Sequence, residues 1–252
     1  MLQVHLFPCL ADNYGFLLHD PAGGETAAID APDGAEYLRQ AEARGWRITQ
    51  IWNTHWHPDH TDGNEAIVAA TGAMCTAPQE VERVSAVDRV VGAGDRVALG
   101  DWSAEVLDVG GHTKEHIAYH LPEARMAFVG DSVFPLGCGR MFEGNAEQFW
   151  ASLLRIKALP ADTLLYSAHE YTAANARFAL HADPENEILR RYASEISARR
   201  DAGEATVPTV LELELATNPF LRADDAPMQQ RWGHPDDAVA SFAALRAAKD
   251  EF

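Results

Sequence analysis

Apolar and polar residues alternate over short stretches in the first two-thirds of the chain, a pattern typical of strands separated by turns. The predicted strands cover residues 1–7, 14–19, 26–29, 48–53, 96–99, 104–109, 117–121, 126–129 and 163–167. Helical spacing of apolar residues predicts helices over 35–44, 64–70 and 149–159. Gly45 supplies a stop for the first of these helices.

The last third of the chain has a different pattern, dominated by helical spacing. Two helices are expected between 172 and 201, with Asp183 as N-cap and Pro184 as first residue of the second. A final helix is expected over 236–249. The run Leu211-Glu212-Leu213-Glu214-Leu215 alternates strictly, so its period alone predicts a short strand. The change of pattern predicts a strand-rich domain over 1–169 and a helical domain over 170–252.

Composition and charge narrow the class of protein. The chain has 252 residues, 47% of them hydrophobic and 23% charged, as in ordinary globular proteins. No apolar run approaches the roughly 20 residues needed to span a bilayer, and the first residues do not resemble a secretory signal. We therefore expect a cytoplasmic protein without a membrane partner. The net charge of −18 disfavours binding to nucleic acid.

The three cysteines are scattered, odd in number and without a CxxC pair, so no disulfide framework is expected. Candidate chemistry lies instead in His55-Trp56-His57-Pro58-Asp59-His60, which places four potential metal ligands within six residues. His55 and His57 are two apart, so on an extended chain both imidazoles point to one side. Pro58 forces a bend, after which Asp59 and His60 can aim at a second point nearby.

Three further candidate ligands follow predicted strands. His112 follows Gly110-Gly111, Asp131 follows the strand over 126–129, and His169 follows the strand over 163–167. Because a metal shell needs roughly four ligands, these residues are expected to complete the site. The other histidines are assigned no role: His5, His19, His116, His120, His181 and His234.

The histidine-rich cluster resembles the defining motif of the metallo-β-lactamase superfamily. Other segments are similar to glyoxalase II, the hydroxyacylglutathione hydrolases. These segments are Asp12-Asn13-Tyr14, Gly111-His112-Thr113, Gly130-Asp131, Leu136–Arg140, His169–Thr172, Asn218–Arg222 and Leu245–Phe252. The resemblance spans the whole chain. It implies an α/β fold, a four-layer αββα sandwich followed by a C-terminal helical domain.

The resemblance also implies an activity: hydrolysis of S-(2-hydroxyacyl)glutathione thioesters, such as S-D-lactoylglutathione, to glutathione and a hydroxy acid in methylglyoxal detoxification. It implies two divalent metal ions, zinc first, with iron or manganese as alternatives. One ion would take His55, His57 and His112, and the other Asp59, His60 and His169, with Asp131 and a hydroxide as bridges. Asp59 and Asp131 would thus take part in catalysis.

The same resemblance implies which residues bind glutathione. These are Arg140, Phe142, Tyr171, Arg246 and Lys249. The three basic residues would form the local positive patch that an anionic substrate needs on an acidic protein. Arg140 and Phe142 depart from the family, which usually carries Lys and Tyr there. The partner is expected to be this small molecule, and the protein to be a monomer.

Other functions remain open from the sequence. One is a glutathione persulfide dioxygenase that uses a single iron, which the complete second set of ligands argues against. Another is a different hydrolase of the superfamily: a nucleic-acid-processing member is disfavoured by the acidic charge and a β-lactamase by the missing export signal. A non-enzymatic sensing module would be expected to have lost ligands, whereas all seven are present.

Overall fold

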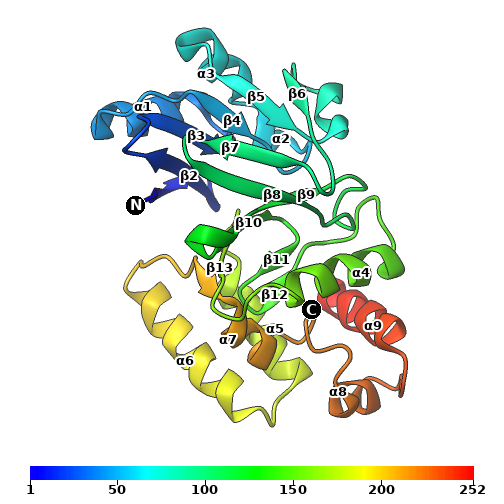
Figure 1. The fold of residues 1–252 in the computed structure, drawn as a ribbon. Coiled ribbons are helices and arrows are strands. Elements are labelled where there is room, and N and C mark those ends of the chain that lie inside the picture. Colours follow the sequence, from blue (N-terminus) through cyan, green and yellow to red (C-terminus); the bar gives the residue numbers. More distant parts are fainter. The chain divides into compact units, whose positions relative to one another are not determined.

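The computed structural model describes all 252 residues, in two compact units. The first unit comprises residues 1–108 and 115–130, and the second comprises 109–114 and 131–252. This division does not coincide with the boundary expected between residues 169 and 170, which stays a prediction. The first unit holds most of the strands, and the second holds most of the longer helices (Figure 1).

The first unit contains a six-stranded sheet in chain order. Its strands are β1 (Gln3–Cys9), β2 (Asn13–Asp20), β3 (Glu25–Ile29), β4 (Gln50–Trp52), β5 (Met74–Ala77) and β6 (Arg89–Val90). The first three strands pair antiparallel, whereas β3 to β6 pair parallel. Parallel neighbours need a crossover connection, and α1 (Gly34–Arg44) and α3 (Asn64–Thr71) lie in two of these connections.

Helix α1 forms where the sequence predicts it, because both of its ends are capped. The Asp33 carboxylate accepts from the backbone N–H groups of Ala35 and Glu36, and Gly45 adopts φ 69° at the C-terminal end. The buried side of α1 carries Tyr37, which packs in one core cluster with Leu17 and Ile51 of the sheet. The helix thus covers one face of the first sheet.

A second, antiparallel set of strands packs on the other face. It comprises β7 (Arg96–Leu99), β8 (Trp102–Asp108), β9 (Ile117–Leu121) and β10 (Met126–Gly130), each paired with the next. The rings of Phe16 and Phe128 are 5.7 Å apart, and those of Trp52 and Tyr119 are 5.2 Å apart. The Tyr119 hydroxyl donates to the Asn53 carbonyl at 2.9 Å. Through these contacts the two sheets pack against each other and form the interior of the unit. Residues 117–121 and 126–129, both predicted as strands, form β9 and β10 and pair antiparallel.

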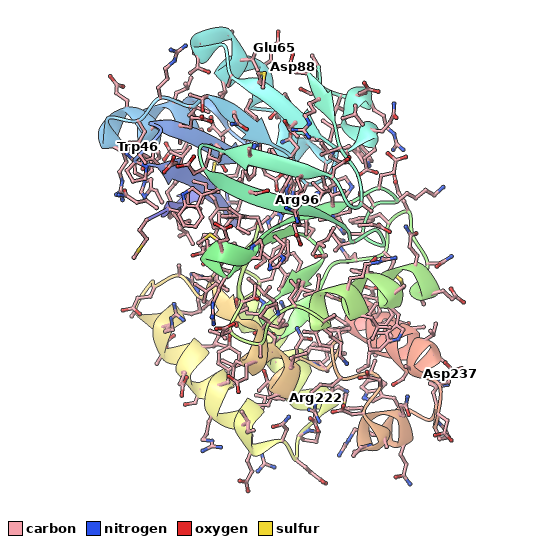
Figure 2. The ribbon with its side chains drawn as sticks, in the orientation of Figure 1. Trp46, Glu65, Asp88, Arg96, Arg222 and Asp237 are labelled. Carbon is pink, nitrogen blue, oxygen red and sulfur yellow. The ribbon has the colours of Figure 1, made fainter.

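The second unit is mostly helical. Its strands are β11 (Val133–Phe134), β12 (Gly137–Cys138), β13 (Leu164–Ser167) and β14 (Thr209–Val210). Its helices are α4 (Ala146–Lys157), α5 (Thr172–Ala182), α6 (Glu187–Asp201), α7 (Leu211–Thr217), α8 (Ala226–Arg231) and α9 (Ala238–Glu251). Helices α4 and α9 pack through Phe149 and Phe242, whose rings are 5.5 Å apart. Asp237 and Arg222 are labelled in Figure 2. Asp237 caps α9, and Arg222 binds the carboxylates of Asp183 and Asp225.

Two local predictions in this unit are wrong. The alternating run Leu211–Leu215 lies in helix α7, because Leu211, Glu214 and Thr217 repeat every three residues and share the buried side. Helix α6 is capped by Asn186, whose side chain accepts from the N–H groups of Ile188 and Leu189. Asp183 instead ends α5 and is occupied by Arg222. In both places contacts distant in sequence outweigh the local pattern.

The remaining elements are short and carry little pattern of their own. They are α2 (Pro58–Thr61) and the 3-10 turns Gln79–Arg83 and Pro122–Ala124. No helix of the structure combines the length and the apolar character required to cross a membrane. The three cysteines are unpaired by disulfides, as predicted.

Candidate metal centre

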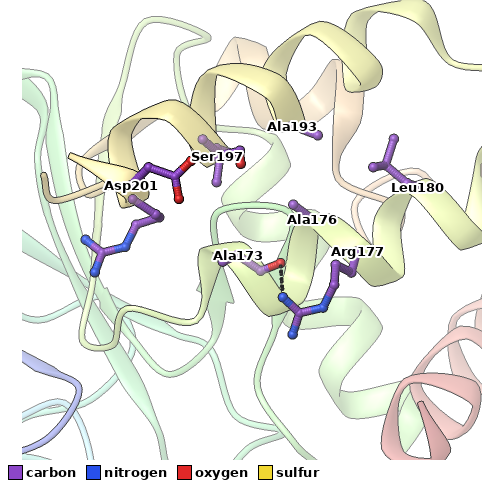
Figure 3. A pocket seen from close by; sticks show the side chains of 9 residues that line it. Ala173, Ala176, Arg177, Leu180, Ala193, Ser197 and Asp201 are labelled. Atoms are coloured by element: carbon purple, nitrogen blue, oxygen red, sulfur yellow. Dashed lines mark hydrogen bonds between the residues drawn. The ribbon is translucent and has the colours of Figure 1, made fainter. Parts of the chain in front are cut away.

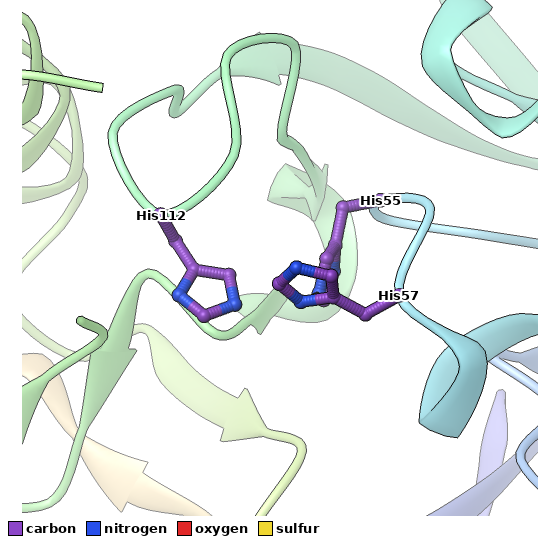
Figure 4. A group of neighbouring side chains, drawn as sticks. All are labelled: His55, His57 and His112. Atoms are coloured by element: carbon purple, nitrogen blue, oxygen red, sulfur yellow. The ribbon is translucent and has the colours of Figure 1, made fainter. Parts of the chain in front are cut away.

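The first unit carries four of the candidate ligands on the loop after β4 and in α2. His55 and His60 are buried, whereas His57 and Asp59 are partly exposed. Nε2 of His55 and Nδ1 of His57 are 3.0 Å apart, with the two rings drawn close together in Figure 4. Pro58 opens α2, so that Asp59 and His60 lie on its turns, and Nε2 of His60 is 3.8 Å from a carboxylate oxygen of Asp59. The predicted bend at Pro58 therefore divides the four candidate ligands into two neighbouring pairs, one on each side of the proline.

Asp30, for which the sequence predicts no role, holds one of these candidate ligands in place. Its carboxylate lies 2.9 Å from Nδ1 of His60 and accepts from the Thr54 N–H at 2.8 Å. It stands after β3 with φ 46° and is buried. With Nδ1 directed to Asp30, Nε2 of His60 carries the lone pair available to a metal. The available signal was a carboxylate directly after a predicted strand.

Asn13 and His116 lie beside the cluster of candidate ligands at residues 55–60. The side-chain amide of Asn13 donates to the Asp59 carbonyl at 3.1 Å, so the Asp12-Asn13-Tyr14 segment supports this loop. His116, to which no role was assigned, is buried with its ring stacked 4.6 Å from that of His55. The cluster thus rests on buried polar and aromatic neighbours from within its own unit.

The second unit carries the other three candidate ligands, and they meet around Asp131. One carboxylate oxygen of Asp131 lies 3.4 Å from Nε2 of His112, and the other lies 3.5 Å from Nε2 of His169. All three residues are buried. His112 stands on the loop after β8 (Figure 4), and its Nδ1 is 2.8 Å from the Arg140 carbonyl, to which it donates. This leaves Nε2 of His112 on the side of Asp131.

Both sets have the donor chemistry of a divalent metal site. The seven side chains are the imidazoles and carboxylates that could hold an ion. His60 and His112 each present Nε2 while Nδ1 is held by an oxygen, the arrangement by which proteins orient histidine ligands to metals. The residues present therefore fit divalent metal ions.

The residues expected to bind substrate all lie in the second unit, in two groups. Arg140, Phe142 and Tyr171 are exposed. The Phe142 ring, 53% exposed, lies 5.2 Å from the His112 ring and 4.6 Å from the Arg140 guanidinium. The Tyr171 ring, 37% exposed, stacks on the His169 ring at 4.7 Å. Two exposed aromatic rings thus flank two candidate ligands.

Arg246 and Lys249 lie deeper than the sequence suggests. Arg246 is only 3% exposed and donates to the Cys138 carbonyl at 2.9 Å and to Asp250 at 3.0 Å. Lys249 donates to the Ala174 carbonyl at 3.2 Å. Burial, followed by the Arg246 charge, lowers the pKa of Lys249. Burial also raises the pKa of the Cys138 thiol to about 11, so that thiol is no nucleophile near pH 7.

A pocket of about 400 Å³ lies apart from these residues, between α5 and α6 (Figure 3). Apolar side chains line part of it, Ala176 and Ile196 among them. Both arginines that line the pocket form hydrogen bonds with backbone carbonyls: Arg177 donates to Ala173, and Arg200 donates to Glu204. None of the predicted site residues lines it, so the pocket is no candidate for the reaction centre.

Comparisons with known proteins identify related families. The metallo-beta-lactamase superfamily model matches residues 15–169, and the model for the hydroxyacylglutathione hydrolase C-terminus matches residues 170–252. The hydroxyacylglutathione hydrolase of Erythrobacter litoralis is 69% identical over 252 residues, with all of both chains covered. That of Hyphomonas neptunium is 53% identical, over all of this chain and 99% of its own.

Solved structures agree on the fold. The B3 metallo-beta-lactamase BLEG-1 matches with a TM-score of 0.68 at 16% identity, over 87% of this chain and 99% of its own. ETHE1 from Myxococcus xanthus matches with a TM-score of 0.67 at 24% identity, over 99% of both chains. These matches and the superfamily model confirm the predicted fold class.

Proposed function

Since this chain belongs to the hydroxyacylglutathione hydrolase family, we propose that it hydrolyses S-(2-hydroxyacyl)glutathione thioesters, typically S-D-lactoylglutathione. The observation that carries the proposal is full-length identity of 69% to a relative of that name, joined to the C-terminal family match over 170–252. Persulfide dioxygenase activity is not favoured, because the full-length relatives at 69% and 53% identity both carry the name hydroxyacylglutathione hydrolase.

We propose that the two sets of ligands together hold two divalent metal ions. The ligands are His55, His57, Asp59, His60, His112, Asp131 and His169. Zinc is the first expectation, with iron or manganese as alternatives. Bound there, such ions would supply Lewis-acid activation of water and of the thioester carbonyl. Support comes from the chemistry of the donors and from the orientation of His60 and His112.

The protein's own residues prepare this chemistry. Asp30 and the Arg140 carbonyl each hold an Nδ1 proton, on His60 and His112, and so keep both Nε2 atoms available. Asp59 and Asp131 are the proposed catalytic carboxylates. No separate general acid is required, because a thiolate is a good leaving group when thiol pKa values are near 8–9.

Substrate recognition is proposed for the residues beside this centre. Arg140 would bind a glutathione carboxylate, while Phe142 and Tyr171 would pack against the peptide part. Arg246 and Lys249 are proposed to add positive charge to the same patch from behind the loop that carries Cys138. The domain limits 1–169 and 170–252 are proposed too, supported by the extents of the two family matches. The cytoplasmic location and monomeric state stay predictions.

The test follows the loss of thioester absorbance of S-D-lactoylglutathione and the metal content of the same sample. Arg140→Ala should raise KM several-fold with a smaller loss of kcat, because a substrate carboxylate lies away from the reacting carbon. Arg177→Ala, an exposed arginine in the α5–α6 pocket, is the matched control and should leave KM unchanged. A metal-replete protein that does not hydrolyse the thioester, or that consumes oxygen with glutathione persulfide, would contradict the proposal.

A further inference from the structure

The loop from Asp131 to Arg140 joins a candidate metal ligand to a proposed substrate residue. Between them lies the short hairpin of β11 and β12, residues 133–138, named here the site hairpin (Figure 1). It is buried, and its non-glycine residue Leu136 has φ 58°. A turn of this kind needs partners for its backbone polar groups, because an unpaired buried group costs free energy.

Side chains from the C-terminal part of the chain supply those partners along the hairpin. The Asn175 amide donates to the Pro135 carbonyl at 3.2 Å. The Asn218 amide donates to the carbonyls of Phe134 at 3.1 Å and Gly137 at 2.9 Å. Arg246 donates to the Cys138 carbonyl at 2.9 Å. A Cβ on Gly137 would overlap the Asn175 side chain, so the fit is close.

Glu214 of α7 is the centre of this arrangement. One of its carboxylate oxygens accepts from the Leu136 N–H at 2.8 Å and from the Asn218 amide at 3.1 Å. The other accepts from the hydroxyls of Thr209 at 2.7 Å and Tyr192 at 3.3 Å. The residue is fully buried and all these partners are neutral. A buried carboxyl group without a cation is costly to ionise, and here four neutral partners satisfy it and fix its place.

The site hairpin lies against residues of the proposed centre. The Phe134 ring lies 6.1 Å from the His169 ring and 5.3 Å from the Tyr171 ring. After the hairpin, Gly139 donates to the Ser132 carbonyl at 3.3 Å, and Arg140 accepts from His112. A shift of the hairpin would therefore move Arg140 and Tyr171, on both sides of the candidate ligands.

We propose that Glu214 is a positioning residue. Through the Leu136 N–H and Asn218 it fixes the position of the site hairpin, and the position of the hairpin determines the selectivity for a glutathione thioester. This inference rests on the proposed function, since it assigns the selectivity of that same site. Glu214 touches neither substrate nor metal ligand, and it acts only through the loop that does.

The test compares Glu214→Leu with Glu214→Gln. Leucine leaves the Leu136 N–H without its acceptor, so KM for S-D-lactoylglutathione should rise roughly 10-fold or more, with a smaller change in kcat. Glutamine should stay within roughly 3-fold of the parent, because its carbonyl still accepts from Leu136 while its NH₂ faces hydroxyls that can accept. Glu212→Leu, at an exposed position of the same helix, is the matched control.

A second substrate makes the outcome specific. With a lactoyl thioester of a short thiol lacking the glutathione peptide, Glu214→Leu should match the parent, so only the ratio of the two kcat/KM values falls. Equal losses on both substrates, equal effects of leucine and glutamine, or an unchanged KM in a folded, metal-replete variant would overturn the proposal. If Glu214→Leu does not fold, Asn218→Ala takes its place with the same expectation. A parent enzyme inactive on lactoylglutathione would instead refute the proposed function.

Discussion

Glu214 should make the stability of the protein depend on pH. Burial raises the pKa of its carboxyl group from 4.5 to about 7. Between these two values the folded state binds more protons at this residue than the unfolded state does, so stability falls as pH rises. The gap between the two pKa values corresponds to about 3 kcal/mol, lost in full only above pH 7.

Glu214→Gln removes this titration and keeps the volume of the side chain. The stability of the variant relative to the parent should therefore increase by up to about 3 kcal/mol from pH 4.5 to pH 8. In a chain of this length that corresponds to roughly 6–12 °C in Tm. Tyr192, the titratable group that faces Glu214, stays neutral throughout, because burial raises the pKa of its hydroxyl further above 10.

The assay is thermal unfolding of parent and variant across this pH range, at equal metal content. Other titrating groups, including the metal ligands, are common to both proteins and cancel in the difference. Glu212→Gln, exposed on the same helix, should show no pH-dependent difference from the parent. A Tm difference between Glu214→Gln and the parent that does not change with pH, or that changes in the parent's favour as pH rises, would refute the reasoning.

Two further substitutions test how the proposed ligands are held. Asp30→Asn should lower metal affinity roughly 10- to 100-fold and leave the fold intact, because His60 loses its carboxylate partner. The measurement is the metal that the protein retains at increasing concentrations of a chelator. Retention equal to that of the parent would contradict the prediction. Gly139→Ala should lower both metal content and kcat/KM, because a Cβ there would overlap the Asp131 carbonyl oxygen, and normal values for both would show that the loop tolerates the displacement.

The first set of candidate ligands and most elements could be predicted from the sequence, because their signals are local. His55 to His60 lie within six residues, and the strands and α1 follow from alternation, turn residues and caps. Their places after predicted strands marked His112, Asp131 and His169 as the remaining candidate ligands, and the structure brings His112 and His169 to Asp131. That grouping depends on contacts between residues far apart in the chain.

Tertiary structure alone decided the features that depend on such contacts. Asp30 reaches Thr54 and His60 because β3 pairs in parallel with β4, which sets Ile29 beside Trp52. The run from Leu211 is a helix because the Glu214 carboxylate finds buried donors on one side, although its alternation alone indicates a strand. Arginine side chains usually lie at the surface, but Arg246 is buried and donates to the Cys138 carbonyl. Local pattern determines where elements and motifs stand, whereas the partners of a buried polar side chain are determined only when distant segments pack together.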